Sequence, residues 1–217
     1  MKLLTMKPIL FNAEMVQAIL AGRKTKTRRP VGEDRRGEWS AVNDCRNHEY
    51  GADVPCYLHR EICVDDYSRN IMYPKYDVGD TLYVRETWRL VDFEYIDGIW
   101  SASVEYKDGT RYARLRFGEE GADKKLGWRP SIHMPREAAR LFLRVTDVRA
   151  EKLQDITEEQ ATVEGFAPVT DWRTGAVLLS ARRLFYMEWD GIYAAKGYGW
   201  KENPWVFVYT FRQVEKT

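Results

Sequence analysis

Several stretches of this chain alternate apolar and polar side chains and are rich in β-branched and aromatic residues, a pattern typical of half-buried strands. Two of them, 99–106 and 111–117, are bracketed by the turn sequences Asp97-Gly98 and Asp108-Gly109, so we expect them to pair as a hairpin. The pattern therefore predicts a chain that is mainly β. The stretches are residues 80–90, 99–106, 111–117, 140–148 and 205–214.

Short helices are predicted between these strands. Residues 12–21 carry apolar side chains at helical spacing, with Asn12 as the N-cap and Gly22 placed to end the helix. A capping box that begins at Thr157 opens a second helix, and residues 180–194 form a third. Many short strands with a few short helices predict an α+β fold built on a barrel or closed sheet, with helical and loop insertions.

Residues 31–76 differ from the rest of the chain because they are polar, lack periodicity and are rich in turn-forming residues. We interpret them as an insertion in a single domain that spans residues 1–217. The insertion holds cysteine and histidine residues at spacings that could supply a tetrahedral zinc site, although free buried thiols are the commoner arrangement. The candidate zinc ligands are Cys45, His48, Cys56, His59 and Cys63.

The charge of the whole chain gives no sign of a polyanion-binding protein, because the net charge of its 217 residues is only +1. Residues 23–36 form a local basic segment with seven Lys or Arg against two acidic residues, which is either a solvated face or a patch for nucleic-acid phosphates. No apolar run reaches the roughly 18 residues that span a bilayer, and the N-terminus lacks the features of a signal peptide. We therefore expect a cytoplasmic protein without a membrane partner.

Lys24 and Thr27, within the basic segment, are candidates for nucleophilic catalysis. A lysine whose pKa is lowered by burial or by neighbouring cations can take the proton of a threonine hydroxyl, which then attacks a carbonyl carbon. Residues three apart on a regular strand face opposite sides, so these two side chains converge only if the chain turns or bulges between them. The alternative is that both are ordinary residues of a basic strand.

Two glutamates stand in positions that disfavour a carboxylate. Glu164 precedes Gly165 at the predicted end of a helix, where the helix dipole costs about 0.3–1 kcal/mol, so it is either a mild surface misplacement or a functional group. Glu86 is expected on the inward, apolar face of its strand and therefore needs a partner. A structural ion pair with a nearby arginine and a role in a site are both open for Glu86.

Residues 128–135 combine aromatic and basic side chains with two prolines, which fix the backbone. Trp128, Arg129 and His133 in this segment suit a loop that stacks on and hydrogen-bonds to a planar ligand, and Trp88 is a second candidate for stacking. A packed crossover between strands explains the same residues equally well.

Six segments, taken together, carry a resemblance to a known family. They are the first helix followed by GRKTKTRR at 22–29, Gly79-Asp80 at the start of a strand, YVRETW at 83–88, WRPSIHMPREAARL at 128–141, LQDITEEQATVEGF at 153–166 and NPWVFVYTF at 203–211. In this order they resemble the ASCH family, and most closely the ASCH-domain proteins of phages and prophages. The resemblance does not extend over residues 31–76 and covers 91–125 only loosely.

The resemblance implies a PUA-like β-barrel with a cleft beside the first helix. Within the family, small bacterial amidohydrolases that act on N4-acetylcytidine use a lysine, a threonine and a glutamate, which fall here on Lys24, Thr27 and Glu164. Arg29 matches the arginine of the same motif and could hold a substrate oxygen or the glutamate. Other members of the family resemble RNA-binding modules or ribonucleases, so membership alone does not give the activity.

The resulting hypothesis is hydrolysis of an acyl amide on N4 of a cytidine-type nucleoside. Lys24 acts as the base, Thr27 as the nucleophile and Glu164 as an acid or as the group that orients water; alternatively Lys24 and Glu164 activate water directly. No metal or organic cofactor is required. A non-catalytic nucleic-acid-binding ASCH module is the alternative, and a nuclease using His133 with Arg129 is a third interpretation. The substrate-binding candidates are Arg29, Glu86, Trp88, Trp128 and Arg129.

Overall fold

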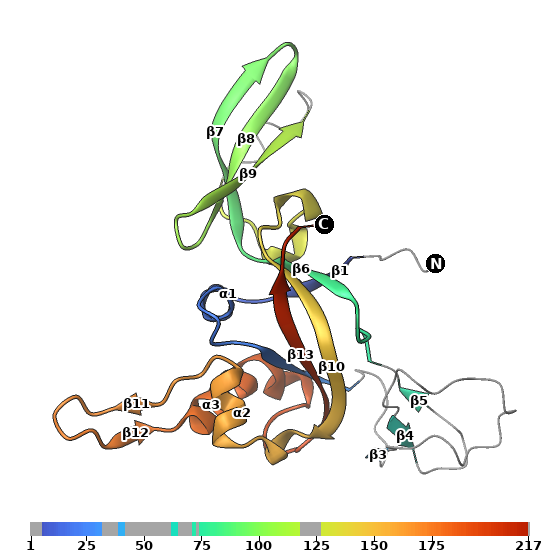
Figure 1. Cartoon of the computed structure of the whole chain (residues 1–217), viewed down its shortest axis with the longest axis vertical. Helices are drawn as coiled ribbons and strands as arrows, with labels where there is room; N and C mark the ends of the chain where they lie inside the picture. The colour runs from blue at the N-terminus through green and yellow to red at the C-terminus, as the bar shows by residue number, and fades with distance from the viewer. Residues whose placement is uncertain are drawn as a thin grey trace, which may run out of the picture. The chain divides into compact units, whose positions relative to one another are not determined.

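The structure is a computed structural model of the chain (Figure 1). The described residues are mainly β with short helices, as the sequence predicts. Contacts divide the chain into two compact units, each assembled from separated segments, and the single-domain interpretation stays a prediction. The first unit comprises Met1–Ala21, Asp80–Arg144 and Gln213–Thr217, and the second comprises Gly22–Gly79 and Val145–Arg212. The structure describes residues 6–31, 39–41, 62–64, 71–72, 74–117 and 127–216.

The first unit contains a sheet of mixed direction. Strand β1 (Lys7–Leu10) runs parallel to β6 (Thr81–Arg85), with Ile9 opposite Val84. The first residues of β10 (Phe142–Lys152) pair antiparallel with the other side of β6. The sequence analysis did not predict β1, because four residues are too few to establish an alternating pattern.

Helix α1 (Ala13–Leu20) has the ends that the sequence predicts. The side chain of Asn12 accepts a hydrogen bond of 2.8 Å from the backbone N–H of Met15. Gly22 follows the helix with a φ of +71°, a left-handed conformation that glycine adopts without steric cost. The prediction of a short helix with an asparagine N-cap is therefore confirmed.

A three-stranded antiparallel sheet follows β6 in the chain. It consists of β7 (Trp88–Ile96), β8 (Ile99–Tyr106) and β9 (Arg111–Phe117), so the predicted hairpin is confirmed. The prediction of one continuous strand over 80–90 is wrong, because the strand ends at Arg85 and a new one begins at Trp88. Glu86 therefore lies in a connection between strands.

The apolar core of the first unit lies where the three-stranded sheet meets the segment after Trp128. That segment forms two 3-10 turns, η3 (Ser131–His133) and η4 (Arg136–Ala138). The buried residues of this core come from the strands and from the segment that contains these two turns. Burial of its side chains therefore holds the segment around Pro130 and Pro135 in place. The core residues are Tyr83, Trp88, Leu90, Ala102, Val104, Tyr106, Met134, Ala138, Ala139 and Phe142.

The second unit is built around β13 (Trp205–Val214), which pairs antiparallel with β2 (Lys26–Pro30) and has β10 on its other side. Helices α2 (Glu158–Val163) and α3 (Ala181–Tyr193) contribute to its core, where Phe185 and Trp189 are buried. Their predicted positions are confirmed, including the capping box at Thr157. Two 3-10 turns complete the helical segments, η5 (Leu153–Asp155) and η6 (Ala194–Lys196).

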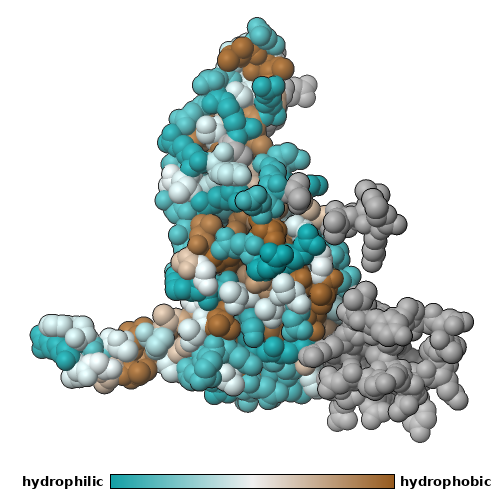
Figure 2. Space-filling model, in the orientation of Figure 1, coloured by the Kyte–Doolittle hydropathy of each residue, from teal (hydrophilic) through white to brown (hydrophobic). Residues whose placement is uncertain are grey.

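Small sheets lie at the margins of the second unit. Figure 1 shows β11 (Val169–Thr170) and β12 (Val177–Leu179) as a hairpin that extends away from α2 and α3. Figure 2 shows hydrophobic colour at this hairpin, where several apolar side chains are exposed. The predicted insertion contains the antiparallel strands β3 (Trp39–Ala41), β4 (Ile62–Val64) and β5 (Ile71–Met72), which the sequence analysis missed.

No helix among the described residues is both long enough and apolar enough to cross a membrane.

Candidate active site

Lys24 and Glu164 lie next to each other in the second unit although 140 residues separate them in the chain. Their backbones form an isolated antiparallel bridge, and the N–H of Thr25 donates to the carbonyl of Val163 at 2.8 Å. Both side chains are buried, with Lys24 1% exposed and Glu164 3% exposed. Two residues that the family resemblance selected independently thus meet in the protein interior.

The Lys24 ammonium donates hydrogen bonds to three acceptors. Its Nζ lies 2.9 Å from Glu164 Oε2, 2.8 Å from the Glu164 carbonyl oxygen and 2.9 Å from the Lys26 carbonyl oxygen. The Lys26 carbonyl belongs to the peptide group that joins Lys26 to Thr27. The lysine side chain thus reaches past Thr25 to the first peptide group of β2.

This arrangement bears on whether Lys24 and Thr27 converge. Alternation along β2 puts Thr27 on one face of the strand and Arg28 on the other. Lys24 and Arg28 bind the same Glu164 carboxylate, so the ammonium lies on the Arg28 side of β2, and alternation directs the Thr27 side chain to the other side. Thr27 is 2% exposed and stands opposite Tyr209 of β13.

Arg28 is the second cation on Glu164. Its Nη1 lies 2.9 Å from Glu164 Oε1, so each carboxylate oxygen has its own cationic donor. The guanidinium also binds Glu151 of β10 and, through Nη2, the Gln160 side-chain oxygen at 2.8 Å. Because Gln160 closes the capping box of α2, the start of that helix is tied to the site.

The sequence analysis missed Arg28. It offered Arg29 as a group that holds either a substrate oxygen or the glutamate, whereas in the structure Arg28 binds the glutamate. Arg29 is half-buried and its Nη1 lies 3.4 Å from the hydroxyl oxygen of Tyr193. Neighbouring arginines on a strand are indistinguishable by residue type, and only the pairing of β2 with the rest of the unit decides which one faces Glu164.

Burial and the second cation determine the protonation of this cluster. Burial lowers the pKa of Lys24; the Glu164 carboxylate opposes this shift, and Arg29 and Arg28 add to it. Burial alone would raise the pKa of Glu164, but Lys24 and Arg28 together hold it below its ordinary value. With two cations on one carboxylate, Glu164 stays ionised and Lys24 is the member that can lose a proton.

Glu164 ends α2, as the sequence predicts, and forms its C-cap. A carboxylate at this end of a helix is disfavoured by the helix dipole, and the two bound cations offset that cost. The carboxylate is therefore not a misplaced surface group. It is held in one position from two sides, as a group needs to be when its geometry matters for chemistry.

The remaining substrate-binding candidates lie in the first unit. Glu86 is buried and receives two hydrogen bonds from Arg140, Nε to Oε1 at 2.8 Å and Nη2 to Oε2 at 2.7 Å. Arg140 Nη2 also lies 2.9 Å from Asp108 Oδ2, and its guanidinium stacks on Tyr106. Glu86 thus forms the structural ion pair that its buried position requires, and Arg140 is its partner.

Replacing Glu86 with glutamine should lower the free energy of unfolding by about 1–3 kcal/mol, because glutamine offers Arg140 one acceptor oxygen where the carboxyl group offers two. Burial raises the pKa of Glu86 above its ordinary 4.5, with Arg140 opposing the shift. The folded state therefore holds this proton to higher pH than the unfolded state, and the carboxyl's contribution to stability falls as the pH rises through that window. The stability advantage of the parent over Glu86→Gln should be larger at pH 4 than at pH 7 in urea denaturation; an advantage that grows with pH would contradict this assignment.

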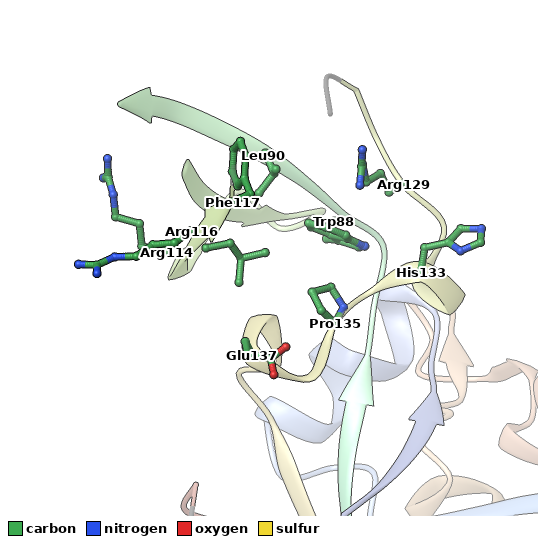
Figure 3. Close-up of a pocket in the computed structure, with 10 residues that line it drawn as sticks. Trp88, Leu90, Arg114, Arg116, Phe117, Arg129, His133, Pro135 and Glu137 are labelled. Carbon is green, nitrogen blue, oxygen red and sulfur yellow. The ribbon is translucent and has the colours of Figure 1, made fainter. Parts of the chain in front are cut away.

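Trp88, Trp128 and Arg129 lie around the same part of the first unit. Trp88 and Arg129 form a backbone bridge, and both line a pocket of about 540 Å³ (Figure 3). The Trp128 ring carries two cations, with Lys107 Nζ 4.0 Å and the Arg89 guanidinium 4.7 Å from its centroid. The structure thus groups these three residues with Glu86 in the first unit and groups Arg29 with Lys24, Thr27 and Glu164 in the second.

Two further sequence predictions concern the basic segment at residues 23–36 and the candidate zinc ligands. Within the segment, Lys24 and Arg28 are buried in ion pairs and so do not form part of a surface patch for phosphates. Cys63 lies in β4, whose backbone alone is described. The other zinc candidates, Cys45, His48, Cys56 and His59, lie outside the described residues.

The site in the second unit contains a buried lysine of lowered pKa and an ionised glutamate bound to two cations, and the buried Thr27 lies three residues after the lysine in the chain. Such a set can move a proton at a carbonyl group and can activate a hydroxyl or a water molecule. No protein-family model, no curated protein and no solved structure matches the chain, so the chemistry of the site has to be inferred from its geometry.

Proposed function

We propose that this chain is an ASCH-family protein with a PUA-like β-barrel, and that it hydrolyses an acyl amide on N4 of a cytidine-type nucleoside. The observation that carries the proposal is the buried contact of 2.9 Å between Lys24 Nζ and Glu164 Oε2. Buried ionisable groups with shifted pKa values cluster at functional sites, although structural ion pairs also produce such shifts. The family's third residue, Thr27, is attached to the peptide group that Lys24 contacts.

The first half of the reaction transfers the acyl group to the enzyme. Neutral Lys24 removes the proton of the Thr27 hydroxyl, whose oxygen forms a bond to the amide carbonyl carbon. As the carbon–N4 bond breaks, the Lys24 ammonium returns that proton to the N4 amine. The products of this step are free cytidine and an ester between Thr27 and the acyl group.

The second half regenerates the enzyme. Lys24 takes a proton from water, the hydroxide oxygen bonds to the ester carbonyl carbon, and the Thr27 oxygen leaves with the proton from Lys24. The acyl group departs as a carboxylic acid. Glu164 accepts hydrogen bonds throughout, and this suits the role of orienting Lys24 and the water.

An acid role for Glu164 is disfavoured, because Lys24 and Arg28 lower its pKa while a proton donor needs a raised one. Lys24 therefore serves as base and acid in turn. Arg29 shares a face of β2 with Thr27 by alternation, so its guanidinium is placed to hold a substrate oxygen. Tyr193, next to Arg29, is a further candidate for substrate contact.

Incubation of the protein with N4-acetylcytidine should release cytidine and acetate, measured by chromatography. Thr27→Ala should abolish turnover, whereas Thr27→Ser should retain part of it because the hydroxyl remains. Thr25→Ala is the matched control, since Thr25 lies in the same segment but has no assigned role, and it should stay active. Rapid quenching followed by mass spectrometry should find one acyl group on Thr27.

The results separate the alternatives. Turnover without acylation, retained in part by Thr27→Ala, would favour direct activation of water by Lys24 and Glu164. Absence of turnover with N4-acetylcytidine and with larger N4-acyl substrates, in a folded protein, would overturn the amidohydrolase proposal and favour the nucleic-acid-binding alternative.

A further inference from the structure

The pocket around Trp88 takes no part in the chemistry proposed above. Its volume of about 540 Å³ is in the range of pockets that hold small organic ligands. Five of its ten lining residues are apolar and the other five are ionisable, so the pocket offers both packing surface and groups that can fix a polar ligand. The residues that matter here are Trp88, Leu90, Phe117, Arg129, His133 and Glu137.

One side of the pocket gathers hydrogen-bond donors. Trp88 is 3% exposed, and its indole N–H has no hydrogen-bond partner among the described residues. Figure 3 shows the indole nitrogen on the side of the pocket where Arg129 and His133 lie. The Arg129 guanidinium lies 5.2 Å from the centroid of the Trp88 ring.

A buried N–H without a partner is costly unless a ligand or water accepts its hydrogen bond. A group with several acceptor oxygens and negative charge suits this side of the pocket, because arginine binds phosphate with two parallel hydrogen bonds. Two further arginines at the margin do not contribute, since Figure 3 shows the side chains of Arg114 and Arg116 directed away from Trp88. Arg114 instead pairs with Glu94 at 2.5 Å.

The rest of the pocket suits a planar ring that carries an amino group. Trp88 and Phe117 provide aromatic surfaces and Leu90 an apolar one, so a flat heterocycle can pack there without loss of hydrogen bonds. Figure 3 shows Glu137 on the other side of Trp88 from Arg129 and His133. A carboxylate accepts hydrogen bonds from the amino group of a base such as cytosine.

We propose that this pocket binds a nucleotide unit, with its phosphate at Arg129 and the Trp88 N–H and its amino-bearing base toward Glu137. The same chemistry is offered by a free nucleotide and by one nucleotide of a single strand. The proposal is independent of the amidohydrolase activity, because the pocket lies in the first unit and Lys24 lies in the second.

Isothermal titration calorimetry of the full chain tests the proposal with cytidine 5′-monophosphate (CMP) as the probe. CMP should bind at least about tenfold more tightly than cytidine or inorganic phosphate, because only CMP fills both sides of the pocket. Uridine 5′-monophosphate (UMP) should bind about threefold to tenfold more weakly than CMP, because uracil has no amino group for Glu137. Equal affinity for CMP and inorganic phosphate would overturn the proposal.

Matched variants locate the site. Arg129→Met should weaken CMP binding by about tenfold or more, since a charged donor to the phosphate is lost. Arg136→Met removes an exposed arginine from the neighbouring η4 turn and should leave the affinity unchanged. Glu137→Gln should reduce the preference for CMP over UMP, and thermal melting of each variant checks its fold. Equal effects of Arg129→Met and Arg136→Met would overturn the assignment.

Two further measurements distinguish a free nucleotide from a nucleic-acid strand as the ligand, and distinguish this proposal from the amidohydrolase proposal. If a five-residue oligocytidylate binds more than about tenfold more tightly than CMP, with a steep salt dependence, the natural ligand is single-stranded nucleic acid. If the two affinities are equal, the ligand is a free nucleotide. Lys24→Arg, which disables the proposed catalytic base, should leave CMP binding unchanged. Loss of turnover with intact CMP binding thus concerns only the amidohydrolase, and absence of CMP binding concerns only this pocket.

Discussion

Replacing Lys24 with arginine should lower kcat/KM for N4-acetylcytidine by about 10²–10⁴-fold while the protein stays folded. Arginine keeps the positive charge beside Glu164 but does not lose its proton at any accessible pH, so it cannot take the proton of Thr27. Lys24→Met should be equally inactive and less stable, because the carbonyls of Glu164 and Lys26 lose their donor.

The pH profile of the reaction identifies Lys24 more sharply than the loss of activity does. Burial lowers the pKa of Lys24 from the ordinary 10.5, and the rate should rise with pH as the ammonium loses its proton. The Glu164 carboxylate favours the ammonium, so Glu164→Gln should move this acid limb to lower pH, in addition to any loss of rate.

The control for these variants is Lys26→Met. Lys26 lies in the same segment, and its backbone carbonyl, which the substitution keeps, accepts the hydrogen bond from Lys24. This variant should keep activity close to that of the parent. An acid limb that stays in place or moves to higher pH in Glu164→Gln, or a Lys24→Arg variant with parental kcat/KM, would show that another group is the base.

Replacing Arg28 with methionine should lower the free energy of unfolding at pH 7 by about 3–5 kcal/mol. Methionine fills a similar volume but leaves Glu164 with one cation in place of two and removes from Glu151 its fully buried partner. Removing one member of a buried ion pair is costly because the remaining charge is no longer compensated. Urea denaturation followed by circular dichroism measures the difference.

The size of this loss should depend on pH. Although burial acts in the opposite direction, Lys24 and Arg28 lower the pKa of Glu164, so this carboxylate stabilises the folded parent above its ordinary pKa of 4.5. That contribution disappears as the pH falls through the depressed pKa of the folded state. In Arg28→Met the pKa of Glu164 is higher, and protonated Glu164 needs no cation, so the difference from the parent should shrink toward pH 3.

Arg23→Met is the matched control for Arg28→Met. Arg23 is exposed and belongs to the same basic segment, so its loss should change the free energy of unfolding by no more than about 0.5 kcal/mol. If the two variants were equally stable, or if the effect of Arg28→Met grew at low pH, the ion-pair cluster would not have the role given to it here.

Local features of the chain were predictable from the sequence. The Asn12 cap of α1, the capping box at Thr157 and the hairpin between β8 and β9 depend on residues a few positions apart, and all three are present. Their energies come from neighbouring backbone and side-chain groups, so a window of the sequence holds the information. Strand β1 and the short strands of the insertion were missed because they have too few residues to show a pattern.

The ion-pair cluster of the second unit depends on contacts that are distant in the chain. Lys24, Thr27 and Glu164 were candidates from their residue types and positions, and resemblance to a family assigned them to one site. That assignment, with the barrel and the activity, remains a proposal. The contact of Lys24 with Glu164 results from a bridge across 140 residues. The choice of Arg28 as the second cation results from the register of β2 with β13, which no local pattern encodes.

In the first unit, too, the sequence indicates a chemical requirement and the fold decides which residue meets it. From the sequence, Glu86 was a carboxylate among apolar residues that needed an arginine, and the identity of that arginine stayed open. In the folded chain β6 ends before Glu86, and Arg140, 54 residues away, lies against it. Local elements and the chemical requirements of buried groups can be deduced from the sequence, because they depend on residue type and near neighbours. Which distant groups meet those requirements is settled by the fold, because strand register and packing place them.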